Sequence, residues 1–222
     1  NSADGSGGGI MNNLSSPTLA DVTFSGNSAG AGGGMENYNG SHPSLKNVTF
    51  QGNSAHGGGA MFNTVNSNPT LTNVTFTGNS SRVNGGAMFN DYSSPTLTNV
   101  TFHANSASTI SSTNRGGGMY NIASSPIIRN TIFWGNTSPS AGGQIYNYNS
   151  PYSVSVPVIS DSVIQAGCPA DSTCSNIITA DPLLGALGNN GGWTQTIPLQ
   201  LGSSAIDTGN DSVCPFTDQR EM

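Results

Sequence analysis

The sequence predicts an all-β fold: a right-handed parallel β-helix, or three-sided β-solenoid, of about six coils with a C-terminal covering segment. Two observations predict it. The motif Phe-x-x-Asn recurs at a nearly fixed step, and a proline recurs with the same period between the motifs. A period of roughly 20–50 residues is typical of stacked repeat architectures. The steps are 26, 26, 26 and 31 residues, between the motif phenylalanines Phe24, Phe50, Phe76, Phe102 and Phe133.

Apolar residues within one repeat predict how the chain turns. Val74 and Phe76 are two apart, so both point to the same side of a strand. Leu71 and Val74 are three apart, so both face one interior only if the chain bends between them. We therefore expect a corner at this point, with its asparagine stacked in the interior. The corner asparagines are Asn47, Asn73, Asn99 and Asn130.

Two further corners complete the predicted coil. One falls at Gly78-Asn79 and the other between Asn63 and Pro69, which gives three short strands and three corners per period. The stretch after Phe-x-x-Asn varies in length, from 54–57 to 106–116, and is expected to be a corner carrying a surface insertion or a functional loop. We infer right-handed coiling from the general rule for parallel crossovers.

Composition excludes the main alternatives to a solenoid. Several glycines, a proline and β-branched residues in each repeat, without sustained 3.6-residue spacing, exclude a helical repeat. The strict period and moderate glycine and proline content exclude a disordered tract. One coil buries too few apolar side chains to offset its ordering entropy, so the predicted coils are stable only when stacked.

Charge and hydropathy indicate an extracellular scaffold. Only 7% of residues are charged and the net charge is −6, so nucleic acid is not an expected partner. No apolar stretch is long enough to span a membrane. Asn1-Ser2-Ala3 matches Asn27-Ser28-Ala29, so the chain begins at a repeat corner, and we expect a processed or partial chain.

The repeats occupy residues 1–165, and residues 166–222 form an irregular C-terminal module. This module has its own apolar residues and is expected to pack on the last coil, covering its open edge. Cys168 and Cys174 are six apart, which in an extracellular chain favours a local disulfide. The zinc alternative is weak because no further ligand follows at suitable spacing. Cys214 is left without a partner.

Two motifs resemble known families. The repeated GG-x-Φ with F-x-x-N, over roughly residues 1–150, is similar to the repeat of the polymorphic outer-membrane proteins, which are surface β-helices acting as adhesins. The tail DPLLG…NNGGWTQT…DQR resembles the C-terminal module of bacterial choice-of-anchor surface proteins, in which a further Cys-containing stretch usually follows. The resemblance implies secretion and a surface role, and it implies no catalytic residues.

The charged residues do not predict an active site. A polysaccharide lyase or hydrolase, the least favoured alternative, needs carboxylates grouped on one face with a basic residue nearby. The acids here are scattered, the five basic residues do not cluster, and the three histidines fall at different phases of the repeat. We therefore predict no catalytic residues, no metal site and no cofactor.

Outward-facing columns are the predicted binding surfaces. The residue after the inward methionine or isoleucine is aromatic in four consecutive coils, which predicts an exposed apolar patch for surface glycans or for a neighbouring rod. The alternative is that the rings only stack on one another. This ladder consists of Phe62, Phe89, Tyr120 and Tyr146.

A second outward column contains threonines, Thr23, Thr49, Thr75 and Thr101. A flat threonine array can bind ice, but the adjacent outward positions do not repeat, so β-propensity is the better explanation. The sequons at Asn47, Asn73 and Asn99 coincide with the interior corners and are therefore interpreted as structural.

Together these features predict a non-enzymatic extracellular structural protein: a cell-surface adhesin segment, a rigid spacer or a self-assembling filament subunit. Self-association is expected end to end or laterally, because an uncapped solenoid end can template another coil. The alternative is a glycan-binding module that uses the aromatic ladder.

Overall fold

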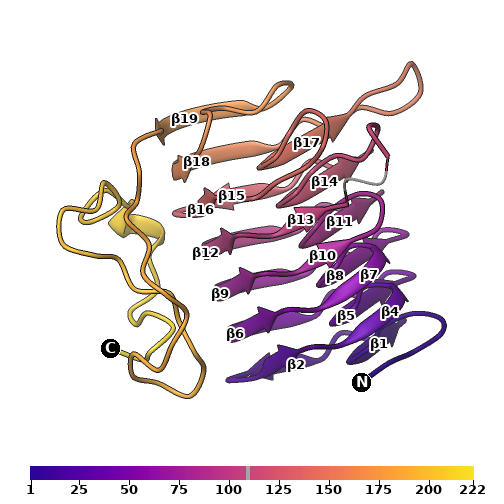
Figure 1. Ribbon diagram of the computed structural model, residues 1–222, viewed down its shortest axis with the longest axis horizontal. Coiled ribbons are helices and arrows are strands. Elements are labelled where there is room, and N and C mark those ends of the chain that lie inside the picture. Colours follow the sequence, from indigo (N-terminus) through magenta and orange to yellow (C-terminus); the bar gives the residue numbers. More distant parts are fainter. Residues whose placement is uncertain (109–110) are drawn as a thin grey trace.

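The computed structural model describes residues 1–108 and 111–222, and it confirms the right-handed parallel β-helix (Figure 1). Three parallel sheets form the walls of a rod, and successive turns of the chain add successive levels to these walls. We number the coils from the N-terminus and name the sheets after the residue that recurs in them. Thr109 and Ile110, within the expected insertion 106–116, lie outside the described residues.

The Met sheet carries the inward methionine column. Its register places Met35, Met61, Met88 and Met119 directly over one another, and all four side chains are fully buried. In coil order its strands are β1 (Ile10–Asn13), β5 (Met35–Tyr38), β8 (Met61–Thr64), β11 (Met88–Asp91), β14 (Met119–Ile122) and β17 (Ile145–Tyr148).

The Phe sheet carries the leucine, valine and phenylalanine columns. Its strands are β2 (Thr18–Ala20), β3 (Thr23–Ser25), β6 (Ser44–Gln51), β9 (Thr70–Thr77), β12 (Thr96–His103), β15 (Ile127–Arg129), β16 (Ile132–Trp134), β18 (Val158–Ile164) and β19 (Thr173–Ile178). The expected bend falls inside β6, β9 and β12, where Asn47, Asn73 and Asn99 have φ of 55°, 56° and 55°. Leu71 and Val74 consequently both face the interior and are buried.

The third wall corrects the predicted corner. Residues 54–57 and their equivalents do not form a simple corner but short parallel strands, here called the Ser sheet. They are β4 (Ser28–Ala31), β7 (Ser54–Gly57), β10 (Ser80–Ser81) and β13 (Ser106–Ala107). A further bend follows at Gly58 and Gly85, whose φ values are 61° and 66°. At Gly58 an added Cβ would lie 2.4 Å from the carbonyl oxygen of Met61, so this bend requires glycine.

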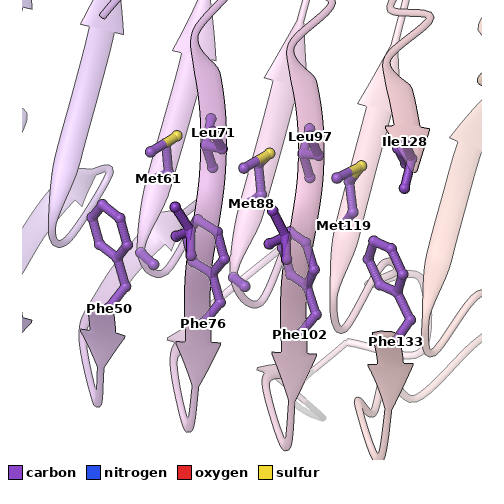
Figure 2. Close-up of a cluster of buried hydrophobic side chains, with 14 of the residues drawn as sticks. Phe50, Met61, Leu71, Phe76, Met88, Leu97, Phe102, Met119, Ile128 and Phe133 are labelled. Atoms are coloured by element: carbon purple, nitrogen blue, oxygen red, sulfur yellow. The ribbon is translucent and has the colours of Figure 1, made fainter. Parts of the chain in front are cut away.

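The core is a set of continuous side-chain columns (Figure 2). Phe24, Phe50, Phe76, Phe102 and Phe133 form one internal stack in which neighbouring ring centroids are 4.4–4.8 Å apart and nearly parallel. This ring spacing matches the distance between hydrogen-bonded strands, so the pairing of the strands itself sets the ring separation.

Asparagine ladders satisfy the polar groups of two corners. In the first, Asn27, Asn53, Asn79 and Asn105 each donate from the backbone N–H and from Nδ2 to the Oδ1 of the asparagine one coil above, at 2.8–3.0 Å. A second ladder links Asn12, Asn37, Asn63, Asn90, Asn121 and Asn147 in the Met sheet at 2.8–2.9 Å. The buried amides of these two ladders are therefore paired, as their desolvation requires.

The C-terminal module does not all lie on the last coil. Residues 166–178 do: the Cys168–Cys174 disulfide is present, and β19 pairs with β18. Residues 181–222 instead lie along the outside of the Phe sheet (Figure 1), and we call them the strap. The strap reaches Asn47 at Thr194, returns to Ala180 at Ser204 and then descends again toward the N-terminal coils. The strap includes one short 3-10 helix, η1 (Asp211–Val213). Its contacts descend the rod, from Asn210 at Asn130 to Thr217 at Asn73 and Glu221 at Asn47.

The strap lies along the Phe sheet because of the polar groups on the outer surface of that sheet. Each corner asparagine in the left-handed conformation turns its amide outward, and the strap supplies partners for these amides. The expected stacking of corner amides is present, with Asn73 Nδ2 donating to Asn47 Oδ1 at 3.3 Å, but these amides lie on the outer side of the sheet under the strap and not in the core as expected. Asn47 and Asn73 are buried under the strap, and Asn99 Nδ2 faces Cys214 Sγ at 3.6 Å.

Candidate functional site

The four aromatic residues predicted as a ladder are brought together on the outer face of the Met sheet. They come from β8, β11, β14 and β17, and the strand register places Phe62, Phe89, Tyr120 and Tyr146 at equivalent positions. Successive ring centroids are 4.9, 4.8 and 5.6 Å apart. Their strands alternate inward methionine or isoleucine with outward aromatic residues, as the pleat dictates.

The rings bury part of one another. The first two contacts are edge-to-face, with interplanar angles of 76° and 80°, and the last pair is stacked at 17°. Tyr120 is only 7% exposed, whereas the other three rings are half-buried. Burial, together with the neighbouring Tyr146, raises the pKa of Tyr120 to about 12. Self-stacking therefore accounts for part of the ladder, and the remaining ring surface is open to a ligand.

A cation borders the ladder at its C-terminal end. The Arg115 guanidinium lies 4.6 Å from the Tyr146 ring centroid, within the range of a cation–π contact. Arg115 also donates a 2.7 Å hydrogen bond from Nη1 to the Tyr146 hydroxyl. Because Arg115 precedes β14, the chain segment 111–116 supplies this group from the rim of the sheet.

A carboxyl group continues the ladder at its N-terminal end. Glu36 pairs in register with Phe62 and is buried, and its Oε2 has no hydrogen-bond partner among residues 1–108 and 111–222. Burial raises the pKa of Glu36, and a side-chain hydrogen bond with Ser6 opposes that rise. The sequence places Glu36 in this column, because it follows the inward Met35, and the strand register puts it there beside Phe62.

A second outward column on the Met sheet was missed from the sequence. It lies two residues after the ladder and contains Tyr38, Thr64, Asp91, Ile122 and Tyr148. Thr64 Oγ1 donates to Asp91 Oδ2 at 3.3 Å, and burial raises the pKa of this carboxyl. The two-residue alternation was the available signal, but the side chains in this column differ too much in chemistry to stand out as a repeat.

Two residues of the threonine column, Thr49 and Thr75, lie beneath the strap. Thr49 and Thr75 are 0% and 3% exposed. Thr75 Oγ1 donates to Gln219 Oε1 at 2.8 Å, and Gln219 Nε2 donates to Thr49 Oγ1 at 2.9 Å. These two positions therefore present no flat threonine surface to water or ice. Asn47 and Asn73, which head two of the sequons, are covered by the same segment.

Titratable side chains elsewhere are dispersed. Within residues 1–108 and 111–222, no three His, Cys, Asp or Glu side chains come close enough together to hold a metal ion. The same ranges contain no helix that is both long and apolar enough to cross a membrane. Cys214 is free and exposed on the strap.

Comparison of the chain with protein-family models, with curated proteins and with solved structures found no match. The resemblance of the repeats and of the tail to surface-protein families therefore stays a prediction. The function of the chain is therefore inferred from its geometry. The coils form a rigid stack, the strap covers one lateral face of it, and the strap does not cover the aromatic face of the Met sheet.

Proposed function

We propose that the protein is a non-enzymatic structural β-solenoid that works outside the cell as a surface adhesin segment or rigid spacer. The observation that carries this proposal is the uninterrupted core, in which one phenylalanine stack and two asparagine ladders run through successive coils. Such a stack holds its lateral faces in a fixed relation to one another. A scaffold of this kind presents a contact surface at a set distance without needing a reaction centre.

Two assays test this proposal: antibody labelling of producing cells and attachment of protein-coated beads to cell surfaces. Antibodies against the solenoid should label intact producing cells as strongly as permeabilised cells. Beads coated with the full chain should attach to cell surfaces, and beads coated with a Phe89→Ser variant should attach less, because Phe89 lies at the centre of the aromatic face. Labelling that requires permeabilisation would refute the extracellular role.

A second candidate function is glycan binding by the aromatic ladder. It is favoured by the open ring surfaces of Phe62, Phe89 and Tyr146 beside the polar groups of Asp91 and Arg115, since aromatic faces stack on sugars and polar groups fix their orientation. A glycan array should give signals with the native chain that weaken about tenfold in Phe89→Ala and Tyr120→Ala.

The matched control for the array is Tyr92→Ala. Tyr92 is an aromatic residue at the corner next to the same sheet, and it is 61% exposed, but it lies outside the ladder. Thermal unfolding of all three variants separates lost binding from lost structure. Unchanged glycan signals in folded Phe89→Ala and Tyr120→Ala would exclude the ladder as the binding surface and leave the scaffold role standing.

End-to-end assembly is a third arrangement, and the C-terminal end of the stack does not favour it. The Phe sheet continues to β19, one level beyond the last strand of the Met sheet, so this end is stepped. Asn147 at the top of its ladder donates to Ala170 O and Ser172 Oγ, at 2.7 and 3.0 Å, in place of another asparagine. We expect single rods, and electron microscopy at high protein concentration tests this.

A further inference from the structure

The C-terminal end of the Met sheet borders a cavity that the scaffold role does not use. The cavity measures about 620 Å³ and lies between the turn at 141–144, the start of β17 and the loop at 164–171. Ile145, Tyr146 and Pro169 give it an apolar side, and Gln144 and Asp171 give it a polar one.

The cavity exists because coil seven is incomplete. In coil six the chain travels 25 residues from Phe133 to Val158, building a level of each wall on the way. In coil seven it travels only nine residues between the matching positions, Ile164 and Thr173. The disulfide-bridged loop takes this short path across the end of the coil, so no strand lies above β17. The cavity is the space of that absent strand.

Two backbone donors point into this space. In each lower coil, the residue before the inward methionine and the methionine itself both donate backbone N–H groups to the coil above. Ala60 and Met61 donate to Ala87 O, both at 2.9 Å, and Ala87 and Met88 donate to Gly118 O at 3.3 and 3.0 Å. Met119 in turn donates to Gln144 O at 2.9 Å.

The equivalent residues in coil six are Gln144 and Ile145. Because alternate residues of a parallel strand bond to opposite neighbours, the N–H of Ile145 is directed away from β14. No acceptor for either N–H is found among residues 1–108 and 111–222. The two donors therefore point to the place where the next coil would present its carbonyl oxygens: one shared oxygen, as Gly118 O is for Ala87 and Met88, or two neighbouring ones, as Gly143 O and Gln144 O are for Gly118 and Met119.

We propose that this cavity binds an extended peptide segment of another polypeptide, which adds a seventh strand to the Met sheet. A main-chain carbonyl of the peptide accepts from the N–H groups of Gln144 and Ile145, and an apolar side chain follows it into the interior above Ile145. Peptides that lengthen an exposed sheet edge gain main-chain hydrogen bonds in this manner. The site thus takes an apolar, uncharged strand.

Charge and sequence pattern favour a main-chain carbonyl over a carboxylate. Asp171 lines the cavity and the chain carries a net charge of −6, so an anion is repelled where a neutral carbonyl is not. The coils themselves show which peptide fits, since each places a small residue and then a methionine above these donors. A second copy of the chain cannot supply its own internal strands, which are buried in its core.

The probe is an end-blocked peptide with the sequence of residues 85–89, acetyl-Gly-Gly-Ala-Met-Phe-amide, titrated into the full ¹⁵N-labelled chain; it stops before the level above Asn147, which Ala170 and Ser172 occupy. We expect saturable binding with shifts centred on the Gln144 and Ile145 amides. In the free protein these two amides should exchange with solvent faster than those of Met88 and Met119. The reversed sequence, Phe-Met-Ala-Gly-Gly with the same blocked ends, is the composition control and should not bind.

Two pairs of variants make the test specific. Gln144→Pro removes one donor and should weaken binding about tenfold relative to Gln144→Ala, which loses the same side chain but keeps the N–H. Ala166→Trp fills the cavity and should abolish binding, whereas Ala20→Trp, on an exposed strand at the far end, should not.

Several results would overturn the proposal. One is slow exchange of the Gln144 and Ile145 amides in the free chain, since both donors would then already be bonded. Others are binding of the reversed peptide with equal affinity, and shifts with acetate ion but not with the blocked peptide, which would make this a carboxylate site. Self-association that occupies the cavity at working concentration would name a second copy as the occupant instead.

Discussion

Single residues set the shape of each coil. The corner asparagines adopt positive φ, which asparagine tolerates better than most residues, and they hold the left-handed bend that lets Leu71 and Val74 face one interior. A substitution by a β-branched residue would strain this bend. The corner was predictable because the three-residue spacing of two apolar side chains demanded it.

The phenylalanine stack gives the first prediction. Phe76 is fully buried between Phe50 and Phe102, at centroid distances of 4.8 and 4.7 Å. Phe76→Ala should lower the free energy of unfolding by about 3–5 kcal/mol, because it removes a large buried side chain and leaves a cavity. Urea denaturation measures this change. The fully exposed Phe216 supplies the control, and Phe216→Ala should stay within about 0.5 kcal/mol of the native chain.

Glu36 gives a prediction about pH. Its pKa in the folded chain is raised above the ordinary value of 4.5 by burial, so the fold favours the protonated acid. The stability that depends on this group is fully present below its ordinary pKa and falls as pH rises through the folded pKa. Glu36→Gln should remove this fall and make the chain more stable than native at neutral pH.

Thermal unfolding at acidic and neutral pH measures the effect. The two proteins should melt at similar temperatures in acid and diverge as the native carboxyl ionises. A variant that is less stable than native at neutral pH would mean that the Glu36 carboxylate has a stabilising partner in solution, and the buried Oε2 would then not be unpaired.

At the scale of elements, the strands that carry large apolar side chains at a regular spacing can be predicted from the sequence. Strands and segments without such side chains cannot. The Met and Phe sheets follow from alternating large side chains, but the strands of the Ser sheet are two to four residues of Ser, Ala, His and Gly without a large apolar side chain. They form because the neighbouring coil supplies their hydrogen bonds. The position of the strap was equally hidden, since its apolar residues do not encode which face they cover.

The aromatic ladder shows the same division. Register alone predicted that Phe62, Phe89, Tyr120 and Tyr146 lie side by side. It did not predict Arg115 against Tyr146, because this contact depends on a segment at the rim whose path is not periodic. Sites built from one column are thus accessible to sequence reasoning, and sites completed by insertions are not.

The strap depends on Gln219, which provides the third prediction. Gln219 donates from Nε2 to Thr49 Oγ1 and Thr194 Oγ1 at 2.9 and 3.0 Å, and it accepts from Thr75 Oγ1. Gln219→Ala leaves three threonine hydroxyls without this partner and should destabilise strap docking by about 1–3 kcal/mol. Hydrogen–deuterium exchange should rise across 209–222 while the coils stay protected.

Gln200→Ala is the control for the strap prediction, because Gln200 lies in the same segment with an exposed side chain. It should leave exchange in 209–222 unchanged. If Gln219→Ala had no effect either, the outward asparagine contacts at Asn73 and Asn130 would be sufficient to hold the strap.

At the scale of the whole molecule, each coil contacts chiefly the coils next to it. Inner coils contact a coil on each side, so stability accumulates from repeat-to-repeat contacts and should be highest in the middle of the rod. Amide exchange should be slowest in β9 and β12, whose apolar residues are fully buried, and faster in β1, β2 and β3, whose burial is incomplete. Mass spectrometry of exchanged fragments measures the gradient, and uniform exchange along the chain would contradict it.

The descending strap brings the two chain ends to the same end of the rod. Asn1 contacts Asn27 in the lowest coils, and Glu221 contacts Asn47 one level above (Figure 1). A mechanical load applied between Asn1 and Met222 would therefore not pass through the stacked coils. It would first detach the strap from the corner asparagines that it contacts. The rod would feel almost none of that tension. Such a molecule responds to force as a rod anchored at one end, with the β17 end free, and not as a rod that is loaded along its length.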